Sequence, residues 1–142
     1  MLYYDLSKLN IDVCIVCETN LNSKIPDSYI SNKSYKLARL DRNVCFCRKR
    51  NCDKTHRGGG VIIICRSSFT LEILDYNKDV ESIWVRLYNH HYPKNNYIFN
   101  ATYFPPKLPK SYNVKFSNYF IESYKLLNEK YPHANYFLGG DF

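Results

Sequence analysis

One long helical pattern near the end of the chain most limits the fold, because it separates a last strand from all the strands before it. Aromatic and apolar side chains recur every three or four residues across residues 111–131, at Phe116, Phe120, Tyr124, Leu127 and Tyr131. This spacing predicts an amphipathic helix, with Ser111 as its N-terminal cap and Pro132 just beyond its end. A helix in this position can carry the chain across a sheet, so the last strand can pair in parallel with an earlier one.

Short apolar or alternating runs, which are typical of strands, fill most of the remaining chain. The run over residues 60–65 is continuously apolar, as in a strand buried on both faces, whereas residues 81–89 alternate and place Ile83, Val85 and Leu87 on one face. The predicted strands cover residues 11–18, 35–42, 60–65, 69–75, 81–89, 97–104 and 134–141; residues 2–10 are predicted as helix, 19–28 and 42–60 as loops, and 89–96 as a turn-rich break. We therefore expect an α/β fold with mixed β-sheets.

The charge of the chain favours an anionic partner. Its 20 Lys and Arg residues outnumber 13 Asp and Glu residues, for a net charge of +7, which points to nucleic acid first and to a membrane surface second. Basic residues are concentrated in the predicted loop 42–60, as candidate phosphate contacts or as an ordinary solvated loop: Arg42, Arg48, Lys49, Arg50, Lys54 and Arg57. No apolar run has the length of about 18 residues that a membrane-spanning helix needs. Nucleic acid is the expected partner, and no membrane partner is expected.

The six cysteines are expected to be reduced, because no secretory signal is visible and an intracellular location is favoured. Three lie within apolar runs and are predicted to be buried thiols: Cys14, Cys17 and Cys65. The other three, with His56, offer four candidate zinc ligands, but their C-x-C-x4-C-x3-H spacing does not match the usual zinc motifs.

Two acidic residues stand at the ends of predicted strands. Glu18 follows the apolar run 13–17, and Asp141 follows Gly139 and Gly140. Open α/β sheets bind ligands at the carboxyl ends of their strands. Two carboxylates there can hold a hard cation such as Mg²⁺. The alternative is that each acid is simply a solvated strand end. Tyr103 precedes a Pro pair that ends its strand, where its hydroxyl could contact a phosphate.

Taken in order, five segments form a recognisable series: "IDVCIVCETNL", "RGGGVIII", "ESIWVRL", "ATYFPP" and "YFLGGDF". The series resembles the endonuclease/exonuclease/phosphatase superfamily, and within it most resembles the endonuclease domain of non-LTR (LINE-type) retrotransposons. The resemblance implies a DNase I-like fold, a four-layer α/β sandwich of two mixed β-sheets flanked by helices. It also implies hydrolysis of phosphodiesters with Mg²⁺ or Mn²⁺.

By that resemblance, Glu18 is expected to bind the metal ion, Tyr103 to lie near the scissile phosphate, and Asp141 to orient the attacking water. The expected partners are DNA and a reverse transcriptase domain in the same polyprotein, and the expected location is the nucleus. The expected DNA contacts are Arg48, Lys49, Arg50 and Arg57.

The resemblance also implies residues that find no match here: an Asn on the first strand, an Asn after Phe142 and a later Ser-Asp-His segment. We therefore expect residues 1–142 to be an incomplete domain, truncated at its C-terminus and without the first strand, and inactive alone. Two alternatives stay open. One is a non-catalytic nucleic-acid-binding remnant, and the other is a related phosphoesterase acting on lipid or small-molecule phosphates.

Overall fold

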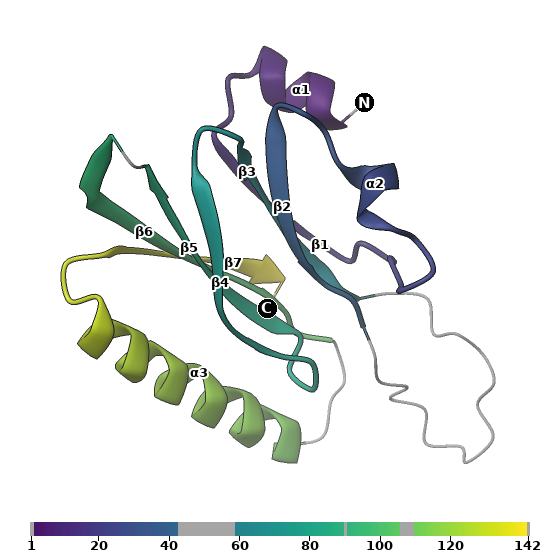
Figure 1. The fold of residues 1–142 in the computed structure, drawn as a ribbon. Coiled ribbons are helices and arrows are strands. Elements are labelled where there is room, and N and C mark those ends of the chain that lie inside the picture. The colour runs from purple at the N-terminus through teal and green to yellow at the C-terminus, as the bar shows by residue number, and fades with distance from the viewer. Residues whose placement is uncertain (1, 43–58, 90, 106–109, 142) are drawn as a thin grey trace.

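A computed structural model describes residues 2–42, 59–89, 91–105 and 110–141. Two β-sheets pack face to face, and helices lie against the outer face of each (Figure 1). The helices α1 (Leu2–Lys8) and α2 (Asp27–Ile30) lie on one side, and α3 (Lys110–Lys130) lies on the other. This arrangement of layers confirms the predicted α/β class.

The first sheet consists of β1 (Val13–Cys17), β3 (Val61–Arg66) and β2 (Tyr35–Leu40), in that order, and both pairs are antiparallel. Its middle strand β3 is buried on both faces, as its apolar sequence predicts. Ile62 and Ile64 pack toward Leu6 of α1, while Val61 and Ile63 pack toward the second sheet.

The second sheet consists of β4 (Thr70–Asn77), β5 (Ser82–Asn89), β6 (Tyr92–Tyr103) and β7 (Asn135–Asp141), in sequence order. The first three strands are antiparallel, and α3 returns the chain so that β7 lies parallel to β6. Only this sheet is mixed, since the described strands of the first sheet are all antiparallel.

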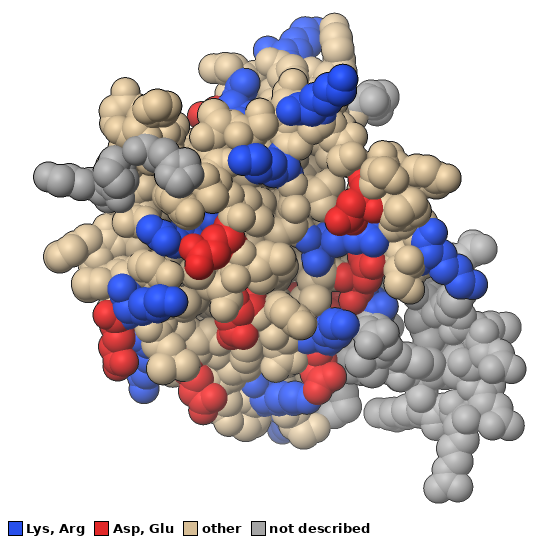
Figure 2. Space-filling model, in the orientation of Figure 1, with Lys and Arg blue, Asp and Glu red and all other residues tan. Residues whose placement is uncertain are grey.

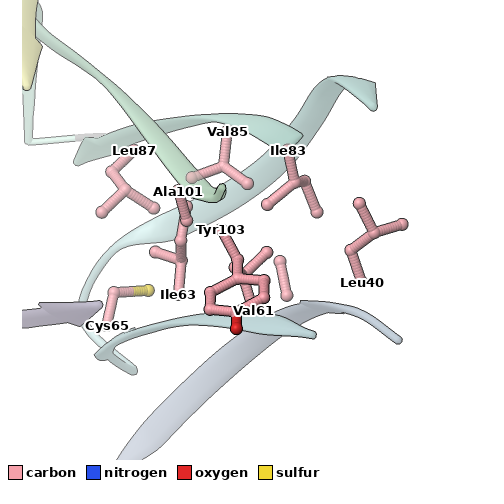
Figure 3. Close-up of a cluster of buried hydrophobic side chains, with 10 residues drawn as sticks. Leu40, Val61, Ile63, Cys65, Ile83, Val85, Leu87, Ala101 and Tyr103 are labelled. Carbon is pink, nitrogen blue, oxygen red and sulfur yellow. The ribbon is translucent and has the colours of Figure 1, made fainter. Parts of the chain in front are cut away.

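The main core lies between the sheets. Val61, Ile63 and Cys65 of β3 face Ile83, Val85 and Leu87 of β5 (Figure 3). Burying each of these branched side chains contributes about 1.5–3 kcal/mol. The predicted alternation of β5 is confirmed, because Trp84 points the other way and packs with Leu127 of α3.

Three local predictions are wrong. The later part of the predicted break 89–96 is strand instead, because β6 begins at Tyr92, and the register of its pairing with β5 is irregular between Tyr88 and Asn89. Helix α2 lies partly within the predicted loop 19–28. Ser111 is not the helix cap, because α3 begins one residue earlier.

None of the helices in the described part of the chain combines the length and the apolar character that crossing a membrane requires.

Candidate functional site

Four strands begin or end at one edge of the molecule, and the predicted metal-binding and catalytic residues lie there. Glu18 directly follows β1, Tyr103 ends β6, Asp141 ends β7, and Glu81 directly precedes β5. In the parallel pair Tyr103 is opposite Asp141, and the next amide, of Phe104, donates to the Asp141 carbonyl at 2.8 Å.

Glu18 and Tyr103 are in direct contact. The Tyr103 hydroxyl donates to Glu18 Oε1 at 2.5 Å, although the two residues are 85 positions apart in the chain. The Tyr103 side chain is buried and Glu18 is exposed. The hydrogen bond to the Glu18 carboxylate and burial both raise the pKa of Tyr103 above its usual 10.0, because each disfavours the phenolate. At neutral pH, the Tyr103 hydroxyl therefore stays protonated and donates a hydrogen bond.

Beneath this contact lies a buried ion pair between Arg42 and Glu81. Arg42 Nε donates to Glu81 Oε1, and Arg42 Nη2 donates to Oε2 at 3.2 Å. The same Oε2 accepts the amide of Gly60 at 3.2 Å. The guanidinium carbon lies 5.2 Å from the centroid of the Tyr103 ring, and the Glu81 carbonyl accepts the Tyr103 amide at 3.1 Å. Tyr103 is thus fixed through its ring and its backbone as well as its hydroxyl.

Gly59 and Gly60 allow the close approach on which this arrangement depends. Both adopt positive φ, of 81° and 82°, which glycine tolerates without steric cost. Their carbonyls accept the amides of Asn20 and Thr19 at 3.1 and 3.3 Å. A Cβ on Gly60 would lie 2.7 Å from Thr19 Oγ1, and one on Gly59 would collide with the Arg42 side chain. Glycine at both positions therefore permits a close backbone approach that a side chain would block.

Asp141 reaches the same edge from β7. Paired residues of neighbouring strands point to the same face, so Asp141 shares its face with Tyr103. On that face, a Cβ on Gly139 would lie 2.7 Å from Cδ1 of Ile15 in β1, so β1 crosses close to β7. The Cys17 thiol lies beside Asp141. Burial is the main cause that raises the pKa of Cys17; a hydrogen bond with the Asp141 backbone opposes this, and the charges of Asp141 and Glu18 add to the rise.

Two carboxylates at this edge are the candidate donors for a metal ion. Among the described residues, no group of three or more Asp, Glu, His or Cys side chains could form a cage around a metal ion. Mg²⁺ is, however, usually held by one or two carboxylates, completed by water and substrate phosphates. Glu18 at the end of β1 and Asp141 at the end of β7, which are linked through Tyr103, are carboxylates of that type.

Several predicted residues lie outside the described part of the chain: Arg48, Lys49, Arg50, Arg57, and the zinc candidates Cys45, Cys47, Cys52 and His56. Of the three predicted buried thiols, Cys65 is fully buried and Cys14 and Cys17 are half-buried, and all three are free. The sequence did not single out Glu81. Its signal was a charge at the start of a strand whose next residues are apolar.

Comparison with known proteins supports the fold. No protein-family model matches this chain, and no curated protein matches it either. A solved structure with a similar fold is that of the human Nocturnin catalytic domain with bound sulfate anion, at a TM-score of 0.68 and 8% sequence identity. The match covers 99% of this chain and 54% of the Nocturnin chain. The chain therefore has a DNase I-like fold and spans about half the length of that structure.

Proposed function

We propose that this chain is part of a Mg²⁺-dependent phosphodiesterase domain that nicks DNA. The observation that carries the proposal is the hydrogen bond from Tyr103 to Glu18, at the edge where Asp141 also lies. The DNase I-like fold and the net charge of +7 support it. The sulfate bound to the Nocturnin domain is an anion of the same shape as phosphate, which is consistent with a phosphate substrate here.

In the proposed mechanism, Glu18 would hold the metal ion. A bound ion would supply Lewis acidity and neutralise charge on the phosphate. Tyr103 keeps its proton at neutral pH and donates a hydrogen bond to the carboxylate or to a phosphate oxygen. Asp141 accepts a hydrogen bond from the attacking water and orients it toward phosphorus. The Arg42–Glu81 pair holds the Tyr103 ring in place.

The retrotransposon context remains part of the proposal and rests on the sequence resemblance alone. It would make DNA the substrate, place a reverse transcriptase domain in the same polyprotein, and place the protein in the nucleus. Arg48, Lys49, Arg50 and Arg57 would then contact DNA phosphates. Because several catalytic residues of the resembled family find no match in residues 1–142, we expect little nicking from this chain alone.

A supercoiled-plasmid assay tests the proposal, with the 142-residue chain and with a longer protein that contains it. In the longer protein, Glu18→Gln should abolish Mg²⁺-dependent nicking and leave DNA affinity nearly unchanged. Glu72→Gln, which removes an acid from β4 at an exposed ion pair with Arg86, is the matched control and should nick like the wild type.

Each other outcome is informative. DNA binding without nicking in the longer protein would favour the non-catalytic remnant. Hydrolysis of lipid or small-molecule phosphates in place of DNA would favour the related phosphoesterase. Full activity of Glu18→Gln would remove Glu18 from the site.

A further inference from the structure

A cavity of about 650 Å³ opens beside the candidate site, where β2 of one sheet approaches β4 of the other. Its lining includes four basic residues and one acidic residue: Lys24, Arg39, Arg42, Lys78 and Asp41. Arg42 also contacts Tyr103, so the cavity and the candidate site share a side chain. A ligand that spans both would pass over Arg42.

The most informative group in the cavity is Arg39. Its Nε bonds Asp27 at 3.0 Å, and its Nη2 lies 3.5 Å from Asp41. Its Nη1 is buried and has no hydrogen-bond partner. Buried donors in folded proteins nearly always find an acceptor, and a phosphate oxygen suits a guanidinium. Asp41 Oδ1 is also buried and unpartnered.

Two further features favour a nucleic-acid strand over a free anion. No described acidic side chain pairs with Lys24 or Lys78, so both ammonium groups are available to backbone phosphates. Tyr76, on the cavity wall, is 54% exposed, and an exposed ring offers a platform on which a base can stack.

The rest of this face does not supply a broad basic surface. Figure 2 shows Lys and Arg side chains interspersed with Asp and Glu across the visible face. Uniform attraction to a polyanion or to a membrane surface is therefore weak here, and binding must come from a defined group of side chains.

We propose that this cavity binds a nucleic-acid strand beside the candidate site, with phosphates against Lys24, Arg39 and Lys78 and a base against Tyr76. The proposal rests on the proposed function only in that it extends the same strand from Tyr103 past Arg42. It names a binding site and requires no catalysis.

The test measures binding of a labelled single-stranded oligonucleotide to the 142-residue chain, by fluorescence anisotropy across a series of salt concentrations. Lys24→Gln with Lys78→Gln should reduce the slope of log affinity against log salt by about 1.4, since each phosphate contact on a single strand contributes about 0.7. The matched control is Lys8→Gln with Lys33→Gln, which makes the same change in charge away from the cavity and should leave the slope unchanged.

A second pair of variants tests the base contact. Tyr76→Ala should weaken binding at least about fivefold, and Tyr76→Phe should retain most of the affinity, because the stacking depends on the ring. Tyr76 is exposed, so neither variant is expected to unfold the chain.

Three outcomes would overturn the proposal: no oligonucleotide binding by the wild-type chain, equal slope changes in the two Lys pairs, or no effect of Tyr76→Ala. Binding to phosphatidylserine vesicles that depends on Lys24 and Lys78, with unchanged oligonucleotide binding, would assign the cavity to lipid headgroups instead. If the longer protein does not nick DNA but the cavity residues still bind the oligonucleotide, the proposed function is wrong and the cavity proposal stands. If the Lys24, Lys78 and Tyr76 variants bind the oligonucleotide like the wild type while nicking is intact, the cavity proposal is wrong and the proposed function stands.

Discussion

Glu81 gives the sharpest test of how the candidate site is built. Its side chain is 1% exposed, and its two carboxylate oxygens accept hydrogen bonds from Arg42 and from the Gly60 amide. The substitution Glu81→Gln preserves the shape of the side chain and removes its charge. The Arg42 guanidinium, whose side chain is 15% exposed, would then be left largely buried without its counter-ion.

Removing one partner of a buried ion pair costs about 3–5 kcal/mol. Gln keeps one oxygen that can still accept from Arg42 or Gly60, so we expect a loss near the lower end, about 3 kcal/mol. A single domain is stable by only about 5–15 kcal/mol, so this is a large fraction of the total. At about 2–4 °C per kcal/mol for a chain near this size, the midpoint of thermal unfolding should fall by about 6–12 °C.

Urea unfolding followed by circular dichroism measures the free energy directly. The control is Glu72→Gln, which removes a carboxylate from a pair whose side chains are 22% and 44% exposed and should cost about 0–1 kcal/mol. Adding Arg42→Met to Glu81→Gln should recover part of the loss, because the uncompensated charge is removed as well. Equal losses for Glu81→Gln and Glu72→Gln would refute the argument that a buried pair supports Tyr103.

Three further predictions concern packing and titration. Gly139→Val should lower stability by about 1–3 kcal/mol through overpacking against Ile15, and Ile15→Val should reduce that penalty in a double-mutant cycle measured by urea unfolding. Because the pKa of Tyr103 is raised on folding, its contribution to stability is fully present below about pH 10 and is lost as pH rises through the folded pKa; the stability difference between wild type and Tyr103→Phe should therefore shrink at alkaline pH, and a constant difference would contradict this. Burial raises the pKa of the Cys65 thiol to about 11, so native-state thiol labelling should modify Cys65 last, and early labelling there would be inconsistent with the core.

The elements that the sequence predicted well are those whose pattern is local. Alternation at Ile83, Val85 and Leu87 follows from the two-residue period of a strand and needs no knowledge of the partner strands. The apolar run of β3 predicted burial on both faces for the same reason. The helix that connects β6 to β7 was visible as a periodic stripe, and it correctly allowed the one parallel pair among the described strands.

What the sequence did not predict depends on pairing between distant segments. The start of β6 is rich in turn-forming residues, and in the fold Tyr92 and Asn96 pair with Asn89 and Tyr88 of β5. Arg42 and Glu81 are 39 positions apart, and they meet because β2 and β5 end and begin at the same edge. Their contact required the packing of two sheets, which no local pattern encodes. The positions of Glu18 and Asp141 at strand ends could be predicted because a charge after an apolar strand is a local signal.

The backbone itself marks Tyr103 as the centre of this edge. Among the described residues, four other than glycine adopt positive φ: Asn10, Glu18, Asn20 and Glu81. The hydroxyl of Tyr103 donates to the side chain of Glu18, at φ 53°, and its amide donates to the carbonyl of Glu81, at φ 43°. Such conformations cost of order 1–3 kcal/mol each and persist only where surrounding contacts enforce them. Two of these four residues are acidic and hydrogen-bond to one buried tyrosine, so costly backbone conformations are concentrated around Tyr103.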